Sequence, residues 1–227
     1  MKKKLYYLVT LFLLSNTLSF SQQEKEALIW FDEIIQPHNL EINSGTEYFE
    51  KYRTSDSNHH FLLDNRFNNA SILYKDQWYH NILSKYDLLE DNLIILINST
   101  KQETSIKPDY NHITAFRIKN RYFTKLKHKN PKGYYEKIAT NNGYTLYKKN
   151  SVKKIKRIKK SYTSFLFKKN EDFYLSKNDL LSKINKKSDW IKAFPNQKKT
   201  VSFYYSQHKK NSSQDKFHIN LLKKLTY

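Results

Sequence analysis

Hydrophobic and polar residues alternate through much of residues 71–175, with turn-forming residues at short and regular intervals. Ile72 and Tyr74 alternate with polar neighbours, and Trp78, His80 and Ile82 share one face of the following segment. The run Leu93–Ile97 has no polar face, which is typical of a central strand covered on both sides. A period of two, broken by regular turns, predicts an antiparallel meander that closes into a sandwich or partial barrel.

Turns are expected at Asp76-Gln77, Asn120-Arg121, Asn142-Gly143 and Asn170–Asp172. The strongest of these signals is Asn142-Gly143, because both central residues of a type I′ hairpin turn need a positive φ. We expect Asn170–Asp172 to separate two strands, Ser164–Phe167 and Phe173–Leu175, in a further hairpin.

The hydrophobic period becomes helical after Leu175. Ser176 and Asp179 resemble a capping box ahead of Leu180, Leu181 and Ile184. Further helical segments are expected at Ala27–Ile35, Trp190–Phe194, Val201–His208 and Phe217–Leu225, although Val201–Tyr205 could also form a strand. The expected fold is α+β, an antiparallel β-meander followed by C-terminal helices. We expect a single globular domain over residues 22–227, mainly β in 22–175 and mainly helical in 176–227.

The first 21 residues have the pattern of an export signal. Lys2, Lys3 and Lys4 precede the apolar stretch Leu5–Leu14, and Ser19 and Ser21 offer small side chains before a cut at Gln22. An uncleaved anchor is the alternative, but so short a stretch cannot cross a hydrocarbon core, which needs about 20 residues. With no cysteine to carry a lipid, we expect the mature chain to be periplasmic or secreted, or peripheral on the outer membrane, without a transmembrane segment.

Charge divides the chain into two unlike parts. The whole sequence has 41 basic and 21 acidic side chains, but residues 22–100 contain 6 basic and 13 acidic ones, whereas residues 101–227 contain 32 and 8. This asymmetry predicts either a polyanionic partner for one face or attraction between the two parts. Lys outnumbers Arg 36 to 5, which suggests that codon bias contributes to the basicity and disfavours sequence-specific nucleic-acid recognition, a task that favours Arg.

The densest basic segment lies between residues 148 and 160 and contains no acid. Its cations are Lys148, Lys149, Lys153, Lys154, Lys156, Arg157, Lys159 and Lys160. If the intervening Val152, Ile155 and Ile158 fix this segment to the body, its cations form a surface stripe that could bind phosphate groups of lipopolysaccharide, acidic glycan or stray nucleic acid. The alternative interpretation is a solvated strand whose outer face is merely basic.

Motifs for catalysis and for cofactors are missing from the sequence. Without cysteine there can be no disulfide, zinc thiolate or cysteine nucleophile, and three glycines leave little scope for a phosphate-binding loop. The eight histidines do not form a zinc-protease pair, so we predict no metal site and no cofactor. His59 with Glu47 and Asp87 could serve a hydrolase, but solvated turn acids are the simpler interpretation.

Several blocks of the chain resemble an uncharacterised secreted family common in Bacteroidota. The blocks are Gly45–Glu50, Tyr52–Thr54, His60-Phe61, Ile72–Tyr79, Lys85–Asp87, Asp91 and Tyr147–Lys149. The order and spacing of these blocks fit, and Trp78 departs from the pattern. The resemblance implies an envelope protein and names no catalytic residue.

Together these features predict a noncatalytic exported protein, not an enzyme. We expect its basic surface to bind an anionic envelope component, such as lipopolysaccharide or acidic glycan, or a protein partner. Two alternatives stay open. The first is a periplasmic carrier of an apolar ligand, similar to lipid or lipoprotein chaperones, which would need a deep apolar cavity. The second is a hydrolase with exposed carboxylates.

Overall fold

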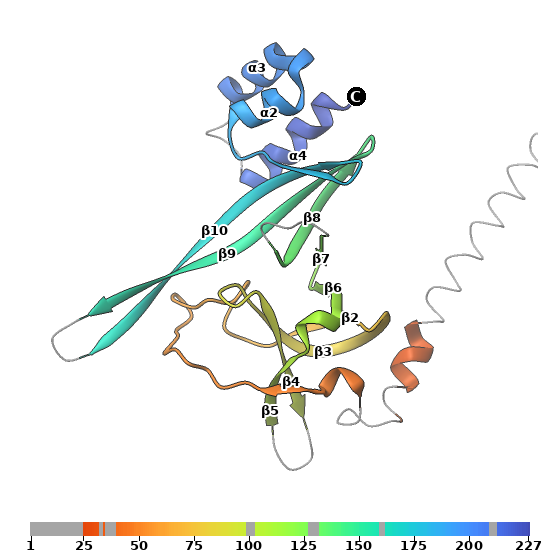
Figure 1. The fold of residues 1–227 in the computed structure, drawn as a ribbon, viewed down its shortest axis with the longest axis vertical. Helices are drawn as coiled ribbons and strands as arrows, with labels where there is room; N and C mark the ends of the chain where they lie inside the picture. The colour runs from red at the N-terminus through yellow and green to blue at the C-terminus, as the bar shows by residue number, and fades with distance from the viewer. Residues whose placement is uncertain are drawn as a thin grey trace, which may run out of the picture.

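A computed structural model of the chain describes residues 25–31, 34, 40–98, 103–126, 132–158, 162–208 and 213–227. Within them, one antiparallel sheet of eleven strands is followed by helices (Figure 1). The strands are β1 (Gly45–Glu47), β2 (Asn68–Tyr74), β3 (Gln77–Asp87), β4 (Asn92–Asn98), β5 (Glu103–Pro108), β6 (Ile113–Ile118), β7 (Arg121–Lys125), β8 (Tyr134–Asn141), β9 (Tyr144–Ile158), β10 (Thr163–Lys177) and β11 (Leu180–Lys183). The predicted fold class, an antiparallel meander with C-terminal helices, is confirmed.

The order of the strands in the sheet is β1-β5-β4-β3-β2-β6-β7-β8-β9-β10-β11. Strands β2 to β5 form one meander, and β6 returns to pair with the free edge of β2 before a second meander continues to β11. Strand β4 lies between β3 and β5, and Leu93, Ile94 and Ile95 in it are buried. The prediction of a central strand at this apolar run is therefore confirmed.

Tight turns with positive φ join several of these strands. Asn142 and Gly143 have φ of 45° and 75°, which confirms the predicted hairpin between β8 and β9. The turn between β2 and β3 is centred on Lys75 and Asp76, one residue earlier than expected. Non-glycine residues adopt this backbone region at some cost, and Asn and Asp tolerate it best.

Two sequence predictions on the C-terminal side are wrong. Strand β10 continues through Asn170–Asp172, because each of its residues from Thr163 to Lys177 pairs with β9 without a break in register. The segment after Ser176 does not form a helix: Asn178 and Asp179 have φ of 48° and 61°, and the turn that they form leads into strand β11. Asn170–Asp172 thus lie in an extended strand despite being typical turn residues, whereas Asn178 and Asp179 form the turn of the hairpin between β10 and β11.

The helical part begins at residue 187. It consists of α2 (Lys187–Ala193), the 3₁₀ helix η4 (Pro195–Gln197), α3 (Lys198–His208) and α4 (Gln214–Leu225). The helical interpretation of residues 201–208 is confirmed, and the alternative of a strand there is wrong. Ser213 caps α4 by accepting a hydrogen bond from the Lys216 N–H. The described residues 25–31 and 34 are also helical, and the proposed signal segment, residues 1–21, lies outside the described part.

Buried side chains form two hydrophobic clusters. The larger lies in the first part of the sheet and includes stacked rings of Phe116 and Phe123, with centroids 4.7 Å apart. The smaller joins the proximal parts of β9 and β10 to the C-terminal helices through Phe173, Trp190 and Leu221. Strand β9 contributes to both clusters, since Leu146 belongs to the smaller one and Val152 packs against the larger one. No helix in the described part of the chain is long and apolar enough to cross a membrane.

Strands β9 and β10 are each 15 residues long and form a two-stranded ribbon. Figure 1 shows this ribbon running from beneath the helices, past the first part of the sheet, to an end that projects from the body. Its proximal end is covered by α4 and its neighbours. Its far end is therefore a part of the molecule in which charge can be presented away from the core.

Candidate functional site

The far end of the β9–β10 ribbon, residues 151–158 and 162–170, is here called the distal hairpin. Its two strands pair from Ser151↔Asn170 to Ile158↔Thr163 without a bulge. It contains six described cations and no acidic residue. The cations are Lys153, Lys154, Lys156, Arg157, Lys168 and Lys169. Four of the six described cations of the basic run thus lie on a projecting element, with two further lysines on the paired strand.

One face of the distal hairpin is attached to the loop that precedes β2. The Asn58 side chain donates to the Phe165 carbonyl (2.9 Å) and accepts from the Phe167 N–H (3.0 Å), so it occupies the edge of β10 as a neighbouring strand would. The Tyr52 ring packs against both phenyl rings at 5.2 and 5.5 Å. Lys154 donates to the Tyr52 hydroxyl at 2.6 Å. Lys154 is therefore a structural contact as well as a surface cation.

The opposite face presents cations around an apolar pair. Lys153 lies directly across from Lys168, and Ile155 lies directly across from Leu166. Arg157 follows on the same face, because residues two apart on a strand share a face. Like charges directly opposite each other on paired strands destabilise the pairing. An anion bound between Lys153 and Lys168 would remove that repulsion.

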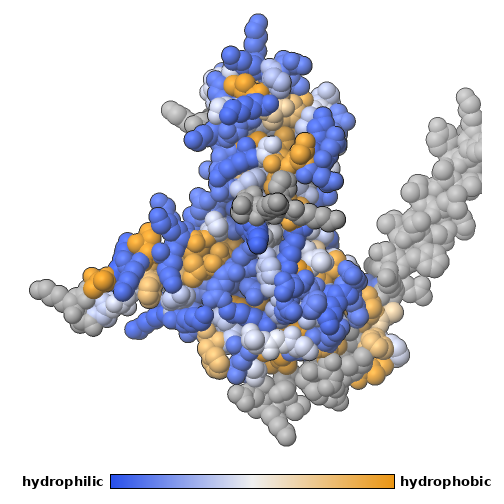
Figure 2. All heavy atoms as spheres, in the orientation of Figure 1, coloured by the Kyte–Doolittle hydropathy of each residue, from blue (hydrophilic) through white to orange (hydrophobic). Residues whose placement is uncertain are grey.

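Four of the six cations have no hydrogen bond or ion pair with any part of the chain that the structure describes. They are Lys153, Lys156, Arg157 and Lys168, and all four are exposed. Figure 2 shows hydrophobic side chains among hydrophilic ones along this projecting arm. The distal hairpin is thus both basic and amphipathic.

Two lysines of the predicted binding run are not part of this surface. Lys148 is buried, and its Nζ lies 2.7 Å from Asp215, 3.5 Å from Glu171 and 3.7 Å from Glu136. Lys149 is also buried, and burial lowers the pKa of its ammonium group. The basic surface is therefore shorter than the predicted stripe, because the first two cations of the run do not belong to it. Lys159 and Lys160, at the other end of the run, lie outside the described residues.

The Lys148 ammonium belongs to an ion network that fixes helix α4 to the sheet. Arg121 donates to both oxygens of Glu136, at 2.7 and 2.5 Å, and Asn150 donates to the same carboxylate at 3.0 Å. Burial acts to raise the pKa of Glu136, but the hydrogen bonds and charge of Arg121 hold it below its ordinary value. Because Asp215 is in the first turn of α4, this network stabilises the helix against β8 and β9.

An ion pair between Lys149 and Asp91 joins the basic and acidic parts of the chain. Asp91 accepts from the Lys149 ammonium at 2.8 Å and from the Tyr86 hydroxyl. Gly133 passes so close to this pair that a Cβ there would collide with the Asp91 carboxylate. The expected attraction between the two parts therefore exists. It uses Lys149 on the ribbon and Lys107 on β5, which pairs with Glu90, and none of the described ion pairs involves a cation of the distal hairpin.

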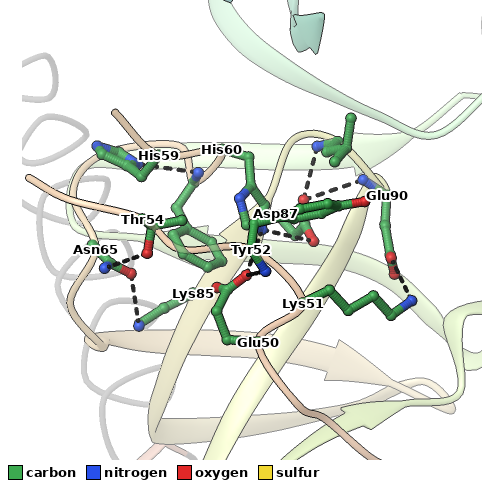
Figure 3. A network of polar contacts seen from close by, with 12 residues as sticks. Glu50, Lys51, Tyr52, Thr54, His59, His60, Asn65, Lys85, Asp87 and Glu90 are labelled. Carbon is green, nitrogen blue, oxygen red and sulfur yellow. Dashed lines mark hydrogen bonds and ion pairs between the residues drawn. The ribbon is translucent and has the colours of Figure 1, made fainter. Parts of the chain in front are cut away.

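A buried histidine lies below the distal hairpin (Figure 3). His60 is 1% exposed, and its Nε2 is 3.5 Å from Asp87 and 3.9 Å from Glu50. Asp87 is 2% exposed and also accepts two backbone N–H groups of the following turn, at 2.8 and 3.2 Å. The imidazole packs against Phe61 and Phe167, at 4.2 and 5.0 Å between ring centroids. Such complete burial suits a group that holds the loop in place beneath β10.

The other residues considered for hydrolysis are placed apart from this pair or are already engaged. Glu47 is exposed on edge strand β1. The His59 Nδ1 accepts the Phe61 N–H at 3.1 Å, and burial followed by the charge of Lys169 lowers the pKa of this histidine. Glu90, in the turn after Asp87, accepts from the ammonium groups of Lys51 and Lys107. Within the described residues, no three His, Asp or Glu side chains are grouped so as to hold a metal ion.

A pocket of about 220 Å³ lies between β10, α3 and α4 and is lined in part by Glu171, Tyr205 and His218. The Trp190 indole N–H donates to His218 Nδ1 at 3.2 Å, so the imidazole is neutral with its proton on Nε2. Burial lowers the pKa of His218 to about 4. This pocket opens beside the polar ion network and is not the deep apolar cavity that a lipid carrier needs.

Sequence reasoning missed Asn58 and Lys168. Asn58 binds a segment 107 and 109 residues away, so local sequence contains no signal for it. Lys168-Lys169 could have been found, because two cations follow the apolar run Phe165–Phe167 without an acid before Glu171. Comparison with known proteins finds no matching family model, curated protein or solved structure.

Proposed function

We propose that this chain is a noncatalytic exported envelope protein that binds an anionic envelope component through the distal hairpin. The observation that carries the proposal is the set of four exposed cations, Lys153, Lys156, Arg157 and Lys168, which have no partner in the described part of the chain. The Lys153–Lys168 pairing across the strands adds a repulsion that a bound anion would relieve. Export is supported by the basic, apolar and small-residue order of residues 1–21.

The position of the acids supports the same function. Of the acidic residues beyond residue 100, Glu136, Glu171 and Asp215 surround Lys148 at the base of the ribbon, and Asp172 pairs with Lys183 at 2.9 Å. These four acids therefore neutralise cations near the helices. The cations of the distal hairpin are not neutralised by them. A surface of one sign attracts polyanions over a Debye length of about 10 Å in ordinary buffer.

The two alternative functions have less support. A carrier of apolar ligands needs a deep cavity, whereas the larger cluster contains closely packed rings such as Phe116, Phe123 and Tyr134. A hydrolase needs convergent groups that a substrate can reach, and the described His60–Asp87 pair is almost fully buried.

Binding to purified lipopolysaccharide and to a soluble acidic polysaccharide tests the proposal. We expect changing Lys153, Lys156, Arg157 and Lys168 together to Gln to weaken binding at least about tenfold at low salt, since each neutralised contact contributes roughly 0.5 kcal/mol. The matched control changes four exposed lysines of the helical part to Gln, at positions 187, 192, 198 and 199. The two variants have the same net charge. Equal loss of binding in both would reduce the effect to overall charge and contradict a role for the distal hairpin.

A further inference from the structure

The distal hairpin has exposed apolar side chains as well as cations. Ile158, at the last described residue of β9, is 75% exposed, and Tyr162, just before β10, is 52% exposed. Ile155 and Leu166 form a cross-strand pair on the face that also presents Lys153 and Arg157. An exposed aliphatic side chain gains nothing from a soluble polyanion, because a hydrated sugar or phosphate chain does not remove it from water.

We infer that the anionic partner of the distal hairpin is a lipid surface with phosphate headgroups, in which Ile158 enters the boundary between headgroups and acyl chains. This inference rests on the proposed function and specifies its partner. Cations beside apolar and tyrosine side chains are the combination that binds such surfaces, since phosphates attract the cations while the interface accepts the apolar groups.

The arrangement of side chains along the ribbon fits this geometry. A strand rises about 3.3 Å per residue, so Arg157 and Lys153 lie roughly 3 and 17 Å from Ile158 along β9. The cations thus extend back from the apolar end toward the body. Among the described residues of β9, a ribbon that meets a bilayer end first would place Ile158 deepest, with Lys153, Lys156 and Arg157 at the level of the phosphates. Lysine stems can extend to reach phosphate groups while their methylene chains lie along apolar surface.

The residue types in the distal hairpin favour a lipid surface over a glycan or a nucleic acid as the partner. Recognition of sugar hydroxyl groups uses carboxylate and amide side chains, and the described distal hairpin contains no carboxylate and one amide, Asn170. Nucleic-acid binding by stacking would need a platform of aromatic rings, whereas Phe165 and Phe167 face the loop at Tyr52.

The test measures co-sedimentation of the full mature chain with vesicles. One set contains phosphatidylcholine with about 30% phosphatidylglycerol, and the other contains phosphatidylcholine alone. A soluble polyanion, heparin, is measured in parallel. The informative variant is Ile158→Ser, and its matched control is Leu180→Ser. Leu180 is 74% exposed at the start of β11, which pairs with the end of β10 remote from the distal hairpin. Urea unfolding verifies that both variants are folded.

We expect Ile158→Ser to weaken binding to the anionic vesicles about fivefold and to leave heparin binding within about twofold of wild type. Leu180→Ser should change neither. If Ile158→Ser binds anionic vesicles as wild type does, while the four-cation variant loses both partners, the lipid inference is overturned and the proposed function stands. If wild type binds neither anionic vesicles nor heparin, both fail.

Discussion

Lysines that are equivalent in the sequence of β9 have different roles in the structure. Lys148 is buried among three carboxylates, whereas Lys153, five residues later, is exposed and faces another lysine. Burial removes an ammonium group from water at a cost of several kcal/mol, which only nearby carboxylates offset. The sequence shows eight cations in thirteen residues without indicating which of them have acidic partners.

Lys148→Met should therefore lower the free energy of unfolding by about 2 to 3 kcal/mol, because it leaves Glu136, Glu171 and Asp215 without their shared cation. Lys153→Met, on the same strand, should change stability by less than about 0.5 kcal/mol. Urea unfolding measures both. A Lys148 variant as stable as the Lys153 variant would contradict the structural role given to the ion network.

His218 should make stability depend on pH. Burial lowers its pKa to about 4, from 6.5 in an unfolded chain, so the folded state binds fewer protons between these values. Its contribution is fully present above pH 6.5 and is lost as the pH falls toward 4. His218→Asn keeps an acceptor for the Trp190 indole but does not titrate. Between about pH 7 and 4.5, wild type should lose roughly 2 kcal/mol more than this variant, as measured by urea unfolding. Equal losses would show that His218 is not buried as described.

At the scale of elements, the ribbon of β9 and β10 forms the projecting arm of the molecule. Both wrong sequence predictions concern residues in β10 or directly after it. The hairpin at Asn142-Gly143 could be predicted because its turn is a local property of two residues. The continuous strand through Asn170–Asp172 could not, because its extended backbone is imposed by pairing with β9. Leu180 and Leu181 fit a helical spacing, yet the two residues before them adopt positive φ and form a turn.

Asn58 should control how firmly the distal hairpin is attached to the body. Asn58→Ala removes hydrogen bonds to the Phe165 carbonyl and the Phe167 N–H, each contributing about 1 kcal/mol. Amide hydrogen exchange should speed up in a peptide covering residues 163–170 and stay unchanged in β4. Asn170→Ala, an exposed amide on the same strand, is the control and should have no such effect. Faster exchange throughout the sheet would instead indicate global destabilisation.

At the scale of the whole molecule, the sequence predicted the fold class and the uneven charge but not where the charge is located. Residues 101–227 have 32 basic and 8 acidic side chains, and the fold brings three of those acids to Lys148. It also brings Asp91 of the acidic part to Lys149. These pairings join residues 12 to 67 positions apart, so only the tertiary structure separates structural cations from free ones. The distal hairpin keeps its positive charge because no acid in the described part of the chain forms an ion pair with its cations.

The salt dependence of binding to lipopolysaccharide tests the central claim most directly. Each cation that contacts a phosphate makes the plot of log affinity against log salt steeper by somewhat less than one unit. The wild-type slope should exceed, by about 2 to 3 units, the slope of the variant in which Lys153, Lys156, Arg157 and Lys168 are Gln. The control variant in the helices should keep the wild-type slope. A wild-type slope near zero, or one that the distal hairpin changes leave intact, would contradict the account.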